Sequence, residues 1–358
     1  MRKNKIDLLK NLISIPSPSG FESKINEFIR QDLLKYVPKS KMRIDTQKNL
    51  IVTIEGKLKK SIVLEAHADT IGFIVTNVDS KGLISLQYIG GGDFQILSAR
   101  HLNILSSKGI VNAVINRKHS HLISDEDTEK IDEIYEAQVD IGIRGRKKVL
   151  RKIEIGDPVV YQPVFERLSE DKNQGQFVAG YGFDDKGGCF ILIEAIKEII
   201  KSRKKPEYTL QFIFSAREEI GNPPKKLTRE LKPELYIGVD VTFATDYGDE
   251  NLEKEVGRCE LGKGIVVYKG VNVHAETVKL LDKIAKKSRI RVQHQASVGD
   301  CGYNATEMVH ICNRMVIVAP PLRCMHTPVE TINLKDLNYG ISLIKNFCLS
   351  KELKRLLR

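Results

Sequence analysis

The chain has 358 residues, of which 41% are hydrophobic and 29% are charged, a composition typical of globular proteins with a sizeable core. No apolar run approaches the roughly 20 residues that cross a bilayer, so we expect no membrane partner. The net charge of +11 comes from lysines spread along a chain without tryptophan, which indicates a solvated basic surface and no nucleic-acid partner.

The first predicted elements are two helices followed by three strands. Apolar residues recur at helical spacing over residues 5–15, and Pro16 and Pro18 end this helix. A second helix is expected over about residues 22–36. Short β-type runs separated by turn and charge signals predict strands at residues 42–44, 50–54 and 62–66.

The character of the chain changes over residues 71–164, where β-type runs alternate with glycine-rich turns such as Gly90-Gly91-Gly92. The runs lie at residues 72–77, 83–89, 102–105, 109–115 and 159–162. We expect this segment to be a small β-rich domain inserted into an α/β domain of residues 1–70 and 165–358.

After Gly180 the α/β pattern returns. Helices are predicted at residues 189–200, 278–287 and 334–358. Strands are predicted at residues 209–214, 235–239, 290–294 and 315–318. The fold class is therefore α/β, with a mixed central sheet flanked by helices.

The six cysteines are scattered without a Cys-x-x-Cys pair, and we expect reduced, buried thiols. Asp7 and Lys10 interrupt the apolar stretch near the amino terminus, which makes it a poor signal peptide. These features predict a cytoplasmic protein.

Acidic and histidine residues follow several of the apolar runs. Strands of an α/β sheet deliver functional side chains at their carboxyl ends. The residues so placed are His67, Asp69, Asp184, Asp185, Glu218, Glu219, Asp240 and His326. Two histidines and several carboxylates suit a pair of divalent cations, so a metal-dependent hydrolase is the first hypothesis.

Each motif alone also has an ordinary interpretation. His67 can be satisfied by Asp69 as a loop neighbour, or can bind a metal while Asp69 accepts its other ring N–H. The pair Asp184-Asp185 can be a helix N-cap. Glu218 and Glu219 can be a solvated pair, although adjacent carboxylates repel unless a cation or proton intervenes. Five such motifs in one chain favour the metal site.

These motifs resemble those of the M42 family of dinuclear metallo-aminopeptidases, also called TET aminopeptidases. The resemblance covers nearly the whole chain. It is carried by His67-Ala68-Asp69-Thr70-Ile71-Gly72-Phe73, Phe183-Asp184-Asp185-Lys186, Glu218-Glu219-Ile220-Gly221, Asp240-Val241-Thr242 and His326-Thr327-Pro328-Val329-Glu330.

The resemblance implies a role for each residue. Asp184 bridges two divalent ions, which are zinc, cobalt or manganese. His67 and Asp240 complete one ion, and Glu219 and His326 the other. Glu218 is the general base and Asp69 orients His67. The implied reaction is hydrolysis of the amino-terminal residue from short peptides.

The resemblance also implies that the inserted segment is a β-barrel-like domain for oligomerisation. The implied assembly is a homo-oligomer, often a tetrahedral dodecamer. The sequence departs from the family pattern at Lys186, at Asn222-Pro223-Pro224 and at Gly299-Asp300-Cys301-Gly302. These departures affect the expected substrate pocket and assembly, and leave the metal site complete.

Three other functions are open. A related metal amidase or deacylase of the M20 type would use similar ligands, but the inserted segment and Asp184-Asp185-Lys186 favour M42. A glycosidase needs two carboxylates, usually without histidine ligands. A non-catalytic peptide-binding scaffold predicts a lost base or ligand, and the sequence retains all of them.

Overall fold

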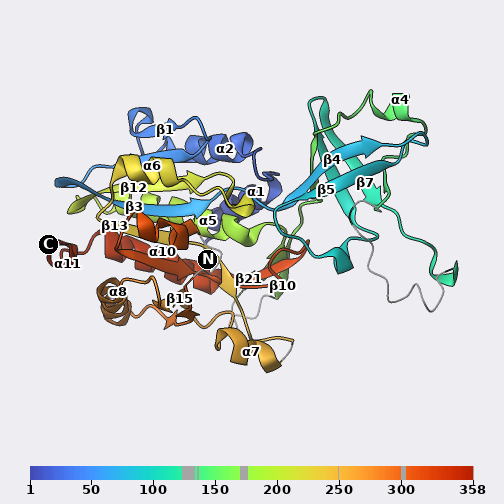
Figure 1. The fold of residues 1–358 in the computed structure, drawn as a ribbon. Helices are drawn as coiled ribbons and strands as arrows, with labels where there is room; N and C mark the ends of the chain where they lie inside the picture. Colours follow the sequence, from blue (N-terminus) through green and yellow to red (C-terminus); the bar gives the residue numbers. More distant parts are fainter. Residues whose placement is uncertain (123–133, 135–136, 170–175, 249, 300–303, 358) are drawn as a thin grey trace.

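A computed structural model describes residues 1–122, 134, 137–169, 176–248, 250–299 and 304–357 (Figure 1). Its centre is an eight-stranded sheet. In spatial order the strands are β1 (Met42–Ile44), β2 (Leu50–Ile54), β12 (Tyr208–Ser215), β3 (Leu58–His67), β13 (Leu235–Val239), β19 (Met315–Ala319), β15 (Ile265–Val267) and β17 (Val292–Gln293). The middle strands β12, β3, β13 and β19 are parallel, and β2 and β15 flank them antiparallel. The predicted mixed sheet is confirmed.

Helices cover both faces of this sheet, which explains why its middle strands are almost continuously apolar. Ile62, Leu64 and Ala66 of β3 face one core, and Val63 faces a second, smaller core on the opposite side. The first core is covered by α1 (Lys3–Ser14), α2 (Ser23–Leu33), α5 (Phe183–Lys201), α8 (Ala275–Ser288), α10 (Leu334–Cys348) and α11 (Leu353–Leu356). The second core is covered by α6 (Lys225–Leu231) and α9 (Asn304–Glu307).

The segment after β3 forms a closed, six-stranded antiparallel barrel with its own apolar core. Around the barrel the strands are β4 (Gly72–Val78), β5 (Ile84–Ile89), β8 (Val139–Asp140), β7 (Gly109–Ile115), β6 (His101–Ser106) and β9 (Pro158–Tyr161). A short helix, α4 (Arg146–Val149), precedes β9. Figure 1 shows β4, β5 and β7 on the right, apart from the main sheet on the left.

A second sheet of five strands lies outside the expectations from sequence. Its strands are β10 (Phe165–Ser169), β11 (Phe177–Gly180), β21 (Glu330–Asn333), β20 (Pro321–Arg323) and β14 (Thr242–Phe243). Two further strands, β16 (Lys269–Gly270) and β18 (Ala296–Ser297), form a separate pair, and α7 (Glu250–Val256) follows β14. The second sheet brings β21 beside the start of α5, which matters for the site described below.

Several predicted bounds needed correction. The helix predicted over residues 334–358 is two helices, because α10 ends at Cys348 and α11 begins at Leu353. The strand predicted at 290–294 is reduced to Val292–Gln293. The helix predicted from residue 189 begins earlier: α5 is assigned from Phe183, but Asp184 and Asp185 have non-helical dihedral angles, so its regular turns begin after Asp185. Five cysteines among the described residues are free thiols; four are buried as expected, and Cys324 is exposed. No helix of the described chain is long and apolar enough to span a membrane.

Candidate metal centre

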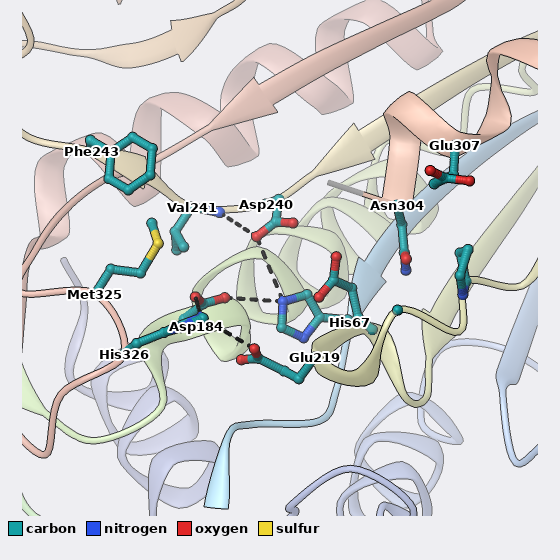
Figure 2. A pocket seen from close by; sticks show the side chains of 13 residues that line it. His67, Asp184, Glu219, Asp240, Val241, Phe243, Asn304, Glu307, Met325 and His326 are labelled. Carbon is teal, nitrogen blue, oxygen red and sulfur yellow. Dashed lines mark hydrogen bonds and ion pairs between the residues drawn. The ribbon is translucent and has the colours of Figure 1, made fainter. Parts of the chain in front are cut away.

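The residues singled out from sequence meet at the carboxyl ends of the parallel strands, as α/β folds favour. His67 ends β3, Asp240 follows β13, and Glu218 and Glu219 follow β12. Asp184 stands at the start of α5, and His326 lies in the loop between β20 and β21. These six side chains line one cavity of about 480 Å³ (Figure 2). Asp69 lies beside it, where it contacts the backbone of Glu218 and Glu219.

The first group of ligand atoms consists of His67, Asp184 and Asp240. His67 Nε2 lies 3.0 Å from Asp184 Oδ1 and 3.7 Å from Asp240 Oδ1. All three ligand atoms lie within 4.8 Å of one another, and all three residues are buried. One nitrogen and two carboxylate oxygens at this spacing can hold a divalent cation.

The second group consists of Asp184, Glu219 and His326, and shares Asp184 with the first. His326 Nε2 lies 3.2 Å from Glu219 Oε2 and 3.3 Å from Asp184 Oδ2. The two oxygens of Asp184 therefore face different histidines, Oδ1 toward His67 and Oδ2 toward His326. A carboxylate in this orientation can bridge two cations.

The site gathers several buried carboxylates around its two histidines. Burial raises the pKa of Glu219 and that of Asp240, and the neighbouring Asp184 carboxylate raises both further. Burial also favours a high pKa for Asp184, but hydrogen bonds to His326 and His67 bring it below its ordinary value. Glu219 Oε1 is buried and has no hydrogen-bond partner among the residues that the structure describes. Crowded carboxylates and an unpartnered oxygen fit a site that binds cations.

The same carboxylates raise the pKa of both histidines. Burial lowers the pKa of His326, but hydrogen bonds to Asp184 and Glu219 outweigh burial and raise it to about 11. Burial opposes the charged form of His67 as well, yet Asp240 and Asp184 raise its pKa well above the ordinary value. Carboxylates that raise the pKa of a neighbouring imidazole also attract cations, and a cation bound there would displace the proton of the ligating nitrogen.

Glu218 lines the cavity but belongs to neither group of ligand atoms. Burial raises its pKa to about 9, with further contributions from Asp240, Glu219 and Asp184. Positive charge placed among these carboxylates would lower that pKa toward the ordinary range. Glu218 is thus a buried carboxyl group that lies beside both groups of ligand atoms and belongs to neither.

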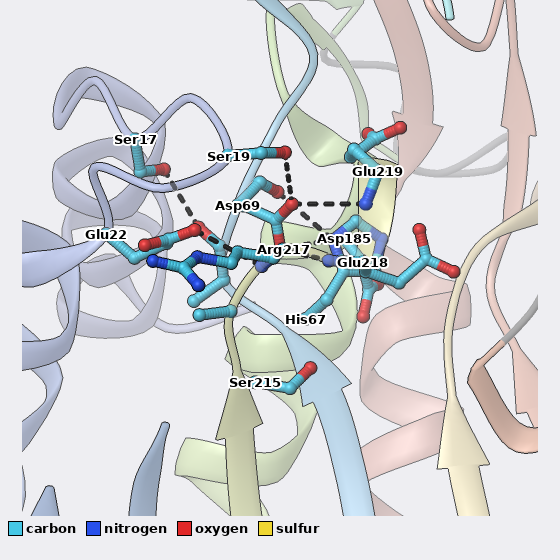
Figure 3. Close-up of polar contacts among 12 residues, drawn as sticks. Ser17, Ser19, Glu22, His67, Asp69, Asp185, Ser215, Arg217, Glu218 and Glu219 are labelled. Carbon is cyan, nitrogen blue, oxygen red and sulfur yellow. Dashed lines mark hydrogen bonds and ion pairs between the residues drawn. The ribbon is translucent and has the colours of Figure 1, made fainter. Parts of the chain in front are cut away.

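Glu218 and Glu219 lie in a short 3-10 turn, Glu218–Ile220. Arg217 and Gly221 flank the pair with φ values of 66°, in the left-handed region. Asp69 accepts the N–H of Glu218 at Oδ1 and that of Glu219 at Oδ2, both at 3.1 Å. The hydroxyl of Ser19 also donates to Asp69 Oδ2 at 2.6 Å (Figure 3). Asp69 therefore holds the backbone of both glutamates.

The expected pairing of Asp69 with His67 takes a different form. His67 Nδ1 lies 3.1 Å from the backbone carbonyl oxygen of Asp69 and 3.6 Å from its Oδ1. The closer partner is therefore the main chain. That contact still fixes the ring so that Nε2 faces Asp184.

Asp184 and Asp185 point to different surroundings, and the contacts of Asp185 are those expected of a helix cap. Asp185 Oδ1 accepts the N–H of Gly188 at 2.8 Å, the geometry of a helix N-cap. A Cβ on Gly188 would lie 2.4 Å from both Asp185 carboxylate oxygens, so this contact requires glycine. Asp184 faces the cavity instead.

Glu330 has a supporting position that sequence reasoning missed. Its Oε2 accepts the N–H of Phe183 at 2.6 Å and that of Asp184 at 3.3 Å. Its Oε1 accepts the N–H of His326 at 3.3 Å. One buried carboxyl group thus fixes two segments that carry ligand atoms. In the sequence, only its position in the motif that begins at His326 points to this role.

Glu65 was also missed, because it sits inside an apolar run. Its Oε1 accepts hydrogen bonds from the Ser215 hydroxyl and, at 2.9 Å, from Asn304 Nδ2. Asn304 in turn lines the cavity.

The departures from the family pattern have different surroundings. Pro223 lines the cavity, and the buried Lys186 donates from Nζ to the carbonyl oxygen of Ile15 at 2.7 Å. Asp300, Cys301 and Gly302 lie outside the described residues.

Comparison with known proteins decides the family. A family model described as M42 glutamyl aminopeptidase matches residues 48–343. The chain belongs to the M42 family. This M42 chain is 30% identical over 356 residues to lysyl aminopeptidase from Pyrococcus furiosus, across 97% of each protein.

Solved structures agree with this assignment. Pyrococcus horikoshii TET1 peptidase, described as assembling into a tetrahedron or a large octahedral shell, has a TM-score of 0.82 at 26% identity, across 97% of this chain and 99% of that chain. A TET aminopeptidase from a Thaumarchaeota archaeon of marine sediment has a TM-score of 0.89 at 23% identity, across 98% of this chain and 97% of that chain, which bears on the fold alone. The predicted family, fold class and enzyme class are confirmed: the M42 chain is a hydrolase that acts on peptides.

Proposed function

We propose that this M42 peptidase is an aminopeptidase that removes the amino-terminal residue of short peptides with two divalent cations. The observation that carries the proposal is Asp184, whose two oxygens face the two histidines of different ligand groups. His67 and Asp240 would complete one cation, and Glu219 and His326 the other. Nitrogen and oxygen ligands of this kind accept zinc, cobalt and manganese.

The remaining residues supply the proton chemistry. Two cations bound at these ligands would polarise the scissile carbonyl and lower the pKa of the attacking water. Glu218 takes the proton of that water and then donates it to the leaving amine. Asp69 keeps Glu218 and Glu219 in place through their backbone N–H groups. Glu330 keeps Asp184 and His326 in place in the same way.

Removal of metal is expected to abolish hydrolysis of aminoacyl chromogenic substrates. Without cations the carboxylates repel or take up protons, so the site is inactive and locally loosened. Dialysis against a chelator followed by cobalt, zinc or manganese should restore turnover. Full activity in a sample shown by elemental analysis to be metal-free would rule out the proposed mechanism.

We also propose that residues 71–164 carry contacts between subunits of a homo-oligomer. The assemblies described for TET1 peptidase support an oligomer. Large apolar side chains are exposed on the outside of the barrel, among them Ile110 at 57% and Val114 at 39% exposed on β7. Such exposure favours contact with another subunit.

Charges placed on β7 are expected to reduce the particle mass. In the double variant Ile110→Glu and Val114→Glu, two carboxylates would be buried if β7 contacts another subunit. Burial of unpaired charges costs free energy and would weaken that contact. Ile44→Glu on β1 is the control, because Ile44 is 44% exposed on the larger domain. Light scattering gives the mass of each. An unchanged mass for the β7 variant would contradict the assignment of the barrel to assembly.

A further inference from the structure

The cavity around the candidate metal centre has two unlike walls. Figure 2 shows Val241, Phe243 and Met325 on one side of the metal centre and Asn304 and Glu307 on the other. The first wall is apolar and the second is polar. A side chain of an amino-terminal residue entering the cavity must pack against one of them.

Two residues of the apolar wall are sequence neighbours of candidate ligand residues. Val241 follows Asp240, and Met325 precedes His326, so each comes from a segment that supplies one outer ligand. Phe243 lies two residues beyond Val241 and is 43% exposed, although it is a large aromatic side chain. An apolar group seated beside the metal centre would cover this ring and gain the free energy of its burial.

The polar wall is already engaged within the protein. The carboxylate of Glu307 pairs with Lys225 Nζ at 2.5 Å, and Asn304 Nδ2 donates to Glu65 Oε1 at 2.9 Å. A basic substrate side chain would therefore compete with Lys225 for Glu307. Among the described residues no lysine or arginine lines the cavity, so an acidic substrate side chain that reaches the polar wall would meet the carboxylate of Glu307, whose partner Lys225 is already paired.

We propose that the apolar wall receives the side chain of the amino-terminal residue, so that this chain prefers leucyl, methionyl and phenylalanyl peptides to glutamyl and lysyl peptides. The inference rests on the proposed aminopeptidase function. The proposed preference differs from the glutamyl aminopeptidase named in the family description. It also differs from that of the P. furiosus relative, which is named a lysyl aminopeptidase.

A panel of aminoacyl p-nitroanilides tests the preference with the metal-loaded, full-length protein. The value of kcat/KM for the leucyl substrate is expected to exceed those for the alanyl, glutamyl and lysyl substrates by at least about 10-fold, since one methylene in an apolar pocket is worth roughly 10–200-fold. Turnover that is highest for the glutamyl or lysyl substrate would overturn the inference and leave the aminopeptidase function standing. No turnover of any substrate would instead refute the aminopeptidase function.

Two truncations locate the preference. Phe243→Ala and Met325→Ala are each expected to lower the leucyl-to-alanyl ratio of kcat/KM several-fold, while alanyl turnover reports that the variant is folded and loaded. Ile44→Ala is the matched control, because Ile44 is 44% exposed and lies outside the cavity lining. If both truncations leave the leucyl-to-alanyl ratio unchanged, even with lower turnover of both substrates, the substrate side chain binds elsewhere and the inference is overturned.

Discussion

Glu218→Gln is expected to lower turnover by roughly 10²–10⁴-fold, the usual contribution of general acid–base catalysis. Glutamine keeps the size of the side chain and cannot take a proton from water. Bound metal should stay near the wild-type level, because Glu218 belongs to neither group of ligand atoms. Turnover of a chromogenic aminoacyl substrate and elemental analysis on the same sample measure both quantities.

Glu219→Gln is the matched control for this experiment. It makes the same chemical change one residue later, but at a member of the second ligand group. Metal content is therefore expected to fall together with turnover. If Glu218→Gln loses metal while Glu219→Gln keeps it, the two roles are reversed. If neither change affects turnover, the reaction takes place elsewhere.

Asp184→Asn is expected to lose both cations and nearly all activity. Asp184 is the one residue shared by the two ligand groups of the described chain, and each of its oxygens faces a different histidine. Asparagine keeps one acceptor oxygen and replaces the other with an N–H donor, which cannot bind a cation. The loss of metal affinity should exceed the 10–100-fold typical of supporting residues.

Asp185→Asn provides the neighbouring control. Asn is as good an N-cap as Asp, so the contact to the Gly188 N–H is retained. Asp185 belongs to neither group of ligand atoms in the described chain, so the loss of its charge removes no candidate cation ligand. We expect near wild-type metal content. Equal metal loss in both variants would show that the loop, rather than the Asp184 carboxylate, determines binding.

The central strands could be predicted from sequence because short apolar runs between turns are a local signal. The bounds of β1, β2 and β13 agree with the prediction to the residue. The second sheet could not be predicted in this way. Strand β14 has only two residues, and its partner β20 comes from a distant part of the chain. Pairings of this kind depend on tertiary contacts that no local pattern reports.

The candidate ligands were found because each follows an apolar run, whereas the supporting acids gave weaker signals. Glu65 interrupts an apolar strand, and its partner Asn304 lies 239 residues away. The position of Asp69 suggested contact with His67 alone, but its carboxylate mainly holds the backbone of Glu218 and Glu219. Such contacts between loops arise only once the strands are placed side by side.

The most direct test of the dinuclear site is an anomalous-difference map from crystals of the zinc- or cobalt-loaded protein. We expect two peaks in each subunit, one between His67 and Asp240 and one between Glu219 and His326, with Asp184 touching both. A single peak, or peaks away from Asp184, would contradict the proposed site.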